Sequence, residues 1–208
     1  APERLHKELS GILCGRQAAA LLEEFSDVLF ELIPELAPCQ GFRQYNPHHT
    51  RDVWTHTLAV VDGAPPEEPL RLAALLHDIG KPEAQCRGKR EGDPDMHYYG
   101  HPEKSMEIVR DIVIPELDRQ GYVISCFDVQ ELLYYVKYHD DHVSVKLKHV
   151  RRHTKMASFA MFQNLMMLQT ADAKAHIQIP IIAERAEICE RLAGEEGRLL
   201  YQRILDGE

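Results

Sequence analysis

Apolar residues recur along most of this chain at intervals of three and four, the spacing that places side chains on one face of an α-helix. No strand-like alternation extends beyond a few residues. The pattern predicts an all-α protein of roughly eight to ten helices. The segments with this spacing are residues 3–14, 16–33, 46–61, 70–80, 101–121, 125–142, 146–154, 156–176 and 180–205.

Several polar or restricted residues mark the boundaries of the predicted helices. Thr50 is a candidate N-cap of the third helix. Ser125 is a candidate N-cap of another, with Asp128 three residues later in a position typical of a capping box. Pro115 should kink or split the long helix around it. Residues 82–100 are polar and rich in glycine and proline, which indicates an ordered or semi-ordered loop.

The composition narrows the class of protein. The 208 residues carry a net charge of −9, which argues against non-specific wrapping of nucleic acid over the whole surface. The apolar runs are far shorter than a membrane span, and the N-terminal residues lack a signal-peptide segment. The five cysteines form no CxxC pair, which is typical of a protein in a reducing compartment. We therefore expect a cytoplasmic protein with one sizeable core.

One apolar segment ends in an unusual way. Residues 73–82 read AALLHDIGKP, so that His77 and Asp78 follow four apolar residues at the edge of the expected core. A buried carboxylate without a compensating partner is costly. The C-terminal end of a helix carries partial negative charge, which favours a cation there. A bound metal ion is therefore the leading candidate to compensate Asp78.

Further histidines and an aspartate lie in or at the ends of other predicted helices, each flanked by apolar residues. Imidazole and carboxylate groups are ligands for iron, manganese, zinc, nickel and cobalt ions. Adjacent residues on a helix point about 100° apart, so His77 and Asp78 share one ion only near the helix end. Asp78 has two oxygens and could also bridge two ions. In chain order the candidate ligands are His56, His77, Asp78, His101, His139 and Asp172.

This order of histidines and aspartates resembles the HD-domain superfamily of metal-dependent phosphohydrolases. Its two additional histidines resemble the subgroup that binds two divalent transition-metal ions. The resemblance implies a helical HD-domain bundle, with Lys81 at the family position that contacts a substrate phosphate. It also implies two ion positions that share a bridging carboxylate: His56, His77, Asp78 and Asp172 for the first, and Asp78, His101 and His139 for the second.

The same resemblance implies the chemistry. In two-metal hydrolysis the ions lie roughly 3.5–4 Å apart, and a metal-activated water becomes the nucleophile. We expect this water to attack a phosphate mono- or diester of a nucleotide or RNA end. His139 or Asp140 would relay the proton to the leaving group, and the sequence HDDH at residues 139–142 offers several candidates.

A closer resemblance covers almost the whole chain. The pattern Q-x-NPHH-x-x-DVW-x-HT at residues 44–57 resembles the C-terminal portion of bacterial CCA-adding tRNA nucleotidyltransferases. It implies a neck-like helical segment at residues 1–45, an HD domain at residues 46–208, and 2′,3′-cyclic phosphodiesterase or phosphatase activity. The glycine-rich and paired-aspartate motifs of that family's catalytic head do not occur here, so we expect no nucleotide addition. We expect either a part of such an enzyme or a stand-alone relative.

The sequence leaves two other functions open. The chain could be a tRNA-binding body whose HD site is vestigial or structural. An oxygenase with a mixed-valent di-iron site would use the same six ligands, although the flanking residues resemble the tRNA-processing family instead.

Other polar residues have both a functional and a structural interpretation. Asp52 would either accept a hydrogen bond from the non-ligating ring nitrogen of His56 or interact with the helix dipole. A basic segment would either contact RNA phosphates or form a solvated helix face, and it contains Lys146, Lys148, Arg151, Arg152 and Lys155. Of the remaining histidines we expect some near the site or in polar loops (His48, His49, His97 and His142) and others at the surface (His149, His153 and His176).

Overall fold

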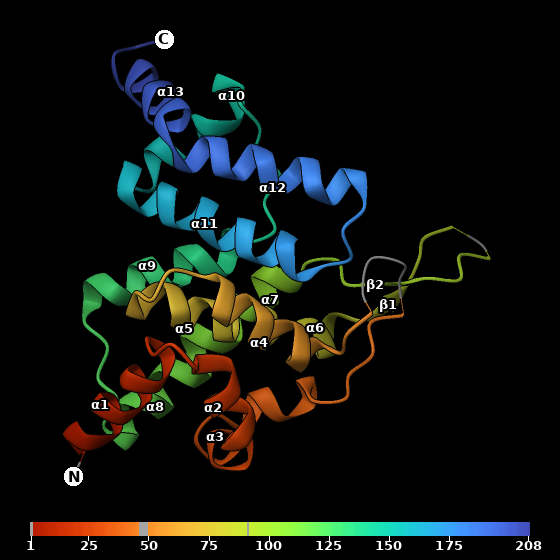
Figure 1. The fold of residues 1–208 in the computed structure, drawn as a ribbon, viewed down its shortest axis with the longest axis vertical. Coiled ribbons are helices and arrows are strands. Elements are labelled where there is room, and N and C mark those ends of the chain that lie inside the picture. The colour runs from red at the N-terminus through yellow and green to blue at the C-terminus, as the bar shows by residue number, and fades with distance from the viewer. Residues whose placement is uncertain (1, 46–49, 91) are drawn as a thin grey trace.

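The computed structural model describes residues 2–45, 50–90 and 92–208, which form an all-α protein with one short hairpin (Figure 1). The expected fold class is confirmed. The helices of the described residues are α1 (Pro2–Leu13), α2 (Ala18–Glu24), α3 (Ser26–Leu32), α4 (Val53–Gly63), α5 (Glu68–Leu76), α6 (Lys81–Ala84), α7 (His101–Ile108), α8 (Ile114–Gln120), α9 (Cys126–Tyr138), α10 (Leu147–Val150), α11 (Phe159–Ala175), α12 (Pro180–Ala193) and α13 (Glu195–Leu205). Short 3₁₀-helices occupy Pro34–Cys39 and His153–Lys155.

The number of helices exceeds the expected eight to ten because some predicted helices are divided. Residues 16–33 form α2 and α3, and residues 180–205 form α12 and α13. The second division falls at Gly194, whose extended backbone ends α12 and caps α13. Two helices, α6 and α10, have only four residues each. The predictions for His48 and His49 lie outside the described residues.

Helices α4, α5, α9 and α11 form the centre of the fold. Helix α4 packs against α5 and α11, and α9 packs against α5, α7 and α11. Figure 1 shows α1–α3 at one end of this group and α12 and α13 at the other. The core between the central helices includes Trp54, Leu75, Tyr135 and Phe162, each at most 1% exposed. Over the part of the chain that the structure describes, no helix combines the length and apolar character needed to cross a bilayer.

The segment predicted as a loop at residues 82–100 contains a short antiparallel hairpin. Strand β1 (Cys86–Arg87) pairs with strand β2 (Met96–His97), with Cys86 opposite His97. The backbone N–H of Met96 also donates a hydrogen bond to the carbonyl of Tyr45, 3.0 Å away. This bond joins the hairpin to the segment that leads to α4.

Two helix starts test the predicted caps. Asp52, rather than Thr50, is the N-cap of α4, so the Thr50 prediction is wrong by two residues. One oxygen of Asp52 accepts from the backbone N–H of Thr55 at 2.8 Å and the other from that of Gly41 at 2.6 Å. These bonds support the helix-terminus interpretation of Asp52, because a carboxylate satisfies the unpaired N–H groups of a first turn.

The cap predicted for α9 is confirmed. The hydroxyl of Ser125 accepts from the backbone N–H of Asp128 at 3.2 Å and donates to its carboxylate at 2.7 Å.

The predicted interruption at Pro115 is present as a π-helical turn over Val109–Val113, between α7 and α8. Proline lacks a backbone N–H and its ring crowds the carbonyl one turn earlier. The wider π turn directly before α8 accommodates both effects without ending the helix.

His153 is buried, so the expectation that it lies at the surface is wrong. Its Nδ1 accepts from the hydroxyl of Tyr134 at 2.8 Å, and its Nε2 donates to Asp141 at 3.1 Å. Its backbone carbonyl accepts from the hydroxyl of Tyr201 at 3.0 Å. The neutral imidazole therefore joins α9, the segment after it and α13.

Acidification should weaken this junction. Burial, together with nearby Arg152, lowers the pKa of His153 from 6.5 to about 4. Between those two values the unfolded chain binds the extra proton, so stability falls as the pH is lowered through that window. When the pH is lowered from 7 to 4, the free energy of unfolding of the metal-free wild type should fall further than that of metal-free His153→Gln. The difference should reach up to about 3 kcal/mol.

Urea titrations at several pH values measure this difference. A His142→Gln control, at an exposed position, should follow the wild type. The same pH dependence in wild type and His153→Gln would show that His153 is not a neutral structural group.

Candidate metal centre

Six side chains converge on the interior of the fold from separate helices. They come from α4, the end of α5, the start of α7, the end of α9 and α11, and each residue is at most 8% exposed. The residues are His56, His77, Asp78, His101, His139 and Asp172. The structure therefore brings together all the residues that the sequence singles out as candidate ligands.

The turn after α5 positions His77 and Asp78. His77 is the C-cap of α5, and the chain then turns through Gly80. The backbone N–H of Gly80 donates to the hydroxyl of Ser105 at 3.0 Å. A Cβ atom at Gly80 would lie 2.6 Å from the backbone nitrogen of Ser105, so only glycine permits this close approach. The approach brings Asp78 beside His101, one turn before Ser105 on α7.

One group of ligand atoms surrounds Oδ2 of Asp78. The Nε2 atom of His77 lies 3.1 Å from this oxygen, and that of His56 lies 3.7 Å from it. The Oδ1 atom of Asp172 lies 2.9 Å from Nε2 of His56 and 3.8 Å from Nε2 of His77. Two imidazoles and two carboxylates in this arrangement could hold one divalent ion.

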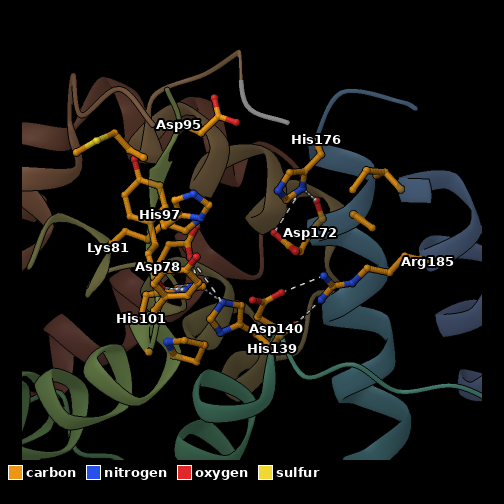
Figure 2. A pocket seen from close by; sticks show the side chains of 17 residues that line it. Asp78, Lys81, Asp95, His97, His101, His139, Asp140, Asp172, His176 and Arg185 are labelled. Atoms are coloured by element: carbon orange, nitrogen blue, oxygen red, sulfur yellow. Dashed lines mark hydrogen bonds and ion pairs between the residues drawn. The ribbon is translucent and has the colours of Figure 1, made fainter. Parts of the chain in front are cut away.

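The other oxygen of Asp78 faces a different pair of histidines (Figure 2). Oδ1 lies 3.3 Å from Nε2 of His101 and 3.5 Å from Nε2 of His139. These two Nε2 atoms are 3.1 Å apart. Asp78 thus presents one oxygen to each group, as a carboxylate that bridges two ions would.

Backbone carbonyls set the tautomers of three of the histidines. Each of these rings bonds through Nδ1 to the carbonyl three residues earlier: His77 to Ala74 at 2.8 Å, His101 to Tyr98 at 2.9 Å, and His139 to Val136 at 2.7 Å. A carbonyl only accepts hydrogen bonds, so Nδ1 carries the proton. With its proton on Nδ1, each ring directs Nε2 towards Asp78, which is how an outer hydrogen bond orients a metal-binding imidazole.

The set fits a bound cation. Nε2 of His77 and both oxygens of Asp78 are buried; Oδ2 is 2.7 Å from Nζ of Lys81, and beyond this ion pair no described residue forms a hydrogen bond with these atoms. The Nε2 atoms of His101 and His139 are both acceptors in the tautomers above, yet they face each other at 3.1 Å. Two lone pairs at this separation repel unless positive charge lies beside them. Divalent metal ions beside the two oxygens of Asp78 would satisfy these atoms.

The charges of the site are those that favour a metal. Burial alone would raise the pKa of Asp78, but His77 and Lys81 hold it well below the usual range. Burial also opposes ionisation of Asp172, and nearby His176 and His56 keep its pKa well below normal. Burial lowers the pKa of His56 to about 4, against the opposing effect of Asp172. At pH 7 both carboxylates are ionised and His56 is neutral, the states in which these groups bind metals.

Lys81 lies beside this set. Its Nζ is 2.7 Å from Oδ2 of Asp78 and donates to Oε1 of Gln44 at 2.9 Å. The lysine is 5% exposed, so its charge is held in place at the edge of the site. The sequence singled out Lys81 but gave no role to Gln44 beyond its place in a motif.

Asp140 lies at the surface next to His139, and the sequence did not indicate its partner, Arg185. Nη1 of Arg185, on α12, donates to Asp140 at 2.9 Å, and Nη2 lies 3.4 Å from the carbonyl of His139. No local pattern could have revealed Arg185, because it lies 45 residues from Asp140 along the chain.

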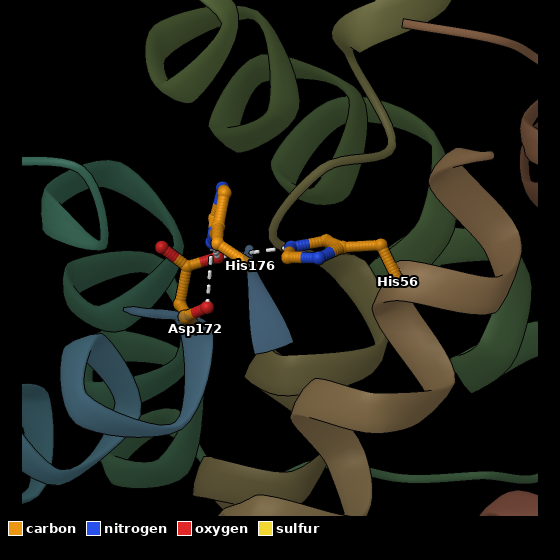
Figure 3. A group of neighbouring side chains, drawn as sticks. All are labelled: His56, Asp172 and His176. Atoms are coloured by element: carbon orange, nitrogen blue, oxygen red, sulfur yellow. Dashed lines mark hydrogen bonds and ion pairs between the residues drawn. The ribbon is translucent and has the colours of Figure 1, made fainter. Parts of the chain in front are cut away.

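His176 is half-buried in the site, and the expectation that it lies at the surface is wrong. Its Nδ1 donates to the backbone carbonyl of Asp172 at 2.7 Å, and its ring meets that of His56 edge-on, with centroids 4.7 Å apart (Figure 3). His56, Asp172 and His176 form a third group whose ligand atoms lie within 4.8 Å of one another. The spacing of four residues after Asp172 was the available sequence signal.

A cavity of about 470 Å³ leads from Asp78 to the surface. Lys81, His101 and Asp172 are buried residues of its lining, and Asp140 is an exposed one (Figure 2). Tyr99 also lines the cavity and is exposed. His97 also lines it, as expected for a residue near the site, and bonds to Asp93 at 2.9 Å. The size is within the range of small-molecule sites.

Comparison with known proteins identifies a matching family model. The model described as HD domain matches residues 48–193. This range contains all six candidate ligands.

Curated relatives are tRNA-processing proteins. A CC-adding tRNA nucleotidyltransferase of Thermus thermophilus is 40% identical over 121 residues, which is 53% of this chain and 26% of the relative. An A-adding tRNA nucleotidyltransferase of Deinococcus radiodurans is 30% identical over 186 residues, 83% of this chain and 39% of the relative. A multifunctional CCA protein of Ralstonia nicotianae is 32% identical over 117 residues, 53% of this chain and 26% of the relative. The aligned part is therefore a minor share of each relative.

Proposed function

The chain belongs to the HD domain family, and we propose that it is a metal-dependent phosphohydrolase acting on a nucleotide or an RNA end. The observation that carries this proposal is the buried carboxylate of Asp78, with one oxygen directed at His56 and His77 and the other at His101 and His139. Lys81 lies beside Asp78, and the cavity opens to the surface, so an anionic substrate could bind there.

Two divalent transition-metal ions are the proposed cofactors. His56, His77, Asp78 and Asp172 would hold one, and Asp78, His101 and His139 the other. Bound there, the ions would supply Lewis-acid stabilisation of a phosphoryl group and ease the deprotonation of water. The mixture of imidazole and carboxylate donors suits iron, manganese, nickel, zinc or cobalt.

The protein's own groups bind and orient the substrate. Lys81, held between Asp78 and Gln44, would donate to a phosphate oxygen from the inner wall of the cavity. For the proton delivered to the leaving group, His139 is the weaker candidate, because its Nδ1 is bonded to Val136 and its Nε2 is directed at Asp78. Asp140 is an exposed residue of the cavity lining, which favours it as the proton relay.

The proposed reaction is that of a 2′,3′-cyclic phosphodiesterase or a phosphatase. The names of the curated relatives, which refer to tRNA, support a substrate with a ribose phosphate end. A buried cationic lysine beside a carboxylate-rich centre suits a dianionic or cyclic phosphate better than a neutral ester.

Loss of hydrolysis on substitution of Asp78 and Lys81 tests the proposal. Asp78→Asn removes the charge that compensates both ions and should reduce the hydrolysis of nucleoside 2′,3′-cyclic phosphates and of phosphomonoesters to background. Lys81→Met should lower kcat/KM by roughly 10² while the metal content is unchanged, because it removes one fixed charge near the phosphate. Chromatographic detection of the nucleoside monophosphate formed from the cyclic phosphates, and phosphate release from the phosphomonoesters, measure both effects in the presence of Mn²⁺, Ni²⁺, Zn²⁺, Co²⁺ or Fe²⁺.

Lys155→Met, at an exposed lysine outside the cavity, is the control and should keep wild-type activity. Full activity in Asp78→Asn would refute the proposed chemistry.

A second candidate function is RNA binding by a body that works with a nucleotidyltransferase head, with residues 1–45 as its neck and 46–208 as the HD domain. The basic segment favours it, but not all of its charges are available. Arg152 forms an ion pair with Asp141, and Arg151 donates to the terminal carbonyl of Glu208. The exposed charges without such a partner in this segment are Lys146, Lys148 and Lys155, as far as the described residues show.

A charge reversal separates this candidate from a solvated surface. Lys148→Glu/Lys155→Glu should weaken tRNA binding at least tenfold in 50 mM salt and lower the slope of log K against log salt by roughly two. Arg4→Glu/Lys7→Glu on α1 changes the net charge equally and should have little effect. Unchanged affinity in the Lys148/Lys155 variant, measured by fluorescence anisotropy, would dismiss this segment as an RNA contact.

A further inference from the structure

A second hollow, of about 550 Å³, adjoins the cavity of the metal centre. It lies between the segment of residues 142–149 and helix α12. Ile182 and Arg185 line both the hollow and the cavity, so the two adjoin at these residues. We call this hollow the α12 groove. A substrate whose phosphate reaches Asp78 therefore has room for its remainder in the α12 groove.

The lining of the groove combines apolar walls with aromatic and polar edges. Five aliphatic side chains contribute to it: Val143, Val145, Ile181, Ile182 and Ile188. At one side the rings of His142 and His149 meet edge-to-face with centroids 6.1 Å apart, and the hydroxyl of Ser144 bonds to Nδ1 of His149. Lys146 adds a positive charge and Glu184 a negative one. Ile181 is 65% exposed, so its apolar side chain is accessible to a ligand.

Arg185 stands at the junction. Its guanidinium is held by Asp140 at 2.9 Å and by the carbonyl of His139 at 3.4 Å, so it projects from α12 across the passage from the groove to the metal centre (Figure 2). A guanidinium has five N–H donors, and these two contacts leave others that could reach a phosphate or a ribose hydroxyl. Its planar face can also stack against a base.

We propose that the α12 groove binds the nucleoside that carries the phosphate cleaved at the metal centre, with Arg185 at the junction of base and phosphate. This inference rests on the proposed phosphohydrolase function. A nucleoside matches the lining because a base has apolar faces for the isoleucines and imidazoles, and polar edges for Ser144 and Lys146. An alkyl chain would contact the apolar walls but would leave the charges of Lys146 and Arg185 poorly solvated. The size of the groove is within the range of small-ligand sites.

Binding tests the groove independently of hydrolysis. The full chain is titrated with adenosine 3′-monophosphate and, separately, with inorganic phosphate; calorimetry measures both affinities, and saturation-transfer NMR follows the base protons of the nucleotide. We expect Ile181→Glu/Lys146→Glu to weaken nucleotide binding at least tenfold and to change phosphate binding less than twofold. Leu199→Glu/Lys7→Glu makes the same change of charge at two exposed residues outside the groove lining, and this matched control should bind as the wild type does.

Kinetics test the same assignment with two substrates. Adenosine 2′,3′-cyclic phosphate carries a base, whereas glycerol 1,2-cyclic phosphate keeps the reacting ring without one. We expect Ile181→Glu/Lys146→Glu to lower kcat/KM at least tenfold for the first substrate and less than twofold for the second. An RNA trinucleotide with the same 3′ end distinguishes the sources of the nucleoside. Tighter binding than that of the mononucleotide would assign the groove to an RNA end, and equal binding to a free nucleotide.

The failures of the two proposals are distinguishable. If neither cyclic phosphate is hydrolysed, the proposed function fails, while the NMR titration still decides the groove. If both are hydrolysed and the groove variant affects neither nucleotide binding nor the ratio of kcat/KM values, the groove assignment is overturned and the hydrolase stands. Displacement of an apolar dye from the groove by an alkyl chain, but not by adenosine 3′-monophosphate, would also overturn it.

Discussion

The carboxylate of Asp78 is the constraint on which the rest of the structure depends. It is 1% exposed, it is ionised, and it lies at the end of a helix whose own C-terminal charge is negative. Lys81 and His77 favour its ionised form, but neither accounts for the Nε2 atoms of His101 and His139, which face each other beside its other oxygen. The free-energy cost of burying this charge is offset if cations occupy the positions between these groups, because a buried charge is tolerated when it is paired or coordinates a metal.

The helical architecture supplies the required geometry through helix ends. His77 and His139 are C-caps, His101 begins α7, and their backbone neighbours accept the Nδ1 protons. Each ring is thereby oriented by the helix that carries it rather than by a flexible loop. Gly80 then permits α7 to approach the end of α5 closely enough for His101 to reach Asp78. Preorganisation of this kind lowers the cost of binding ions and substrate.

The sequence was informative where chemistry coincided with the ends of apolar segments. Periodicity predicted the helices, and the polar residues that interrupted it identified Asp78 and the five other candidate ligands gathered around it. The pattern could not indicate Arg185, because its contact with Asp140 depends on how α12 packs against the end of α9. It also misassigned His153 and His176, since a histidine in a polar stretch looks exposed until tertiary packing covers it. The α12 groove could not be predicted for the same reason, because residues 142–149 and 181–188 meet only in the folded chain.

Metal content tests the central claim, that the two oxygens of Asp78 bridge two ions, most directly. Mass spectrometry of the purified protein, without chelators, should give about two transition-metal ions per chain for the wild type, as a two-metal centre requires. His101→Gln should retain one ion and Asp78→Ala none, while His142→Ala, which changes an exposed histidine, should match the wild type. Two ions retained by Asp78→Ala, or no ion taken up by folded wild-type protein from Mn²⁺, Ni²⁺, Zn²⁺ or Fe²⁺, would contradict the account.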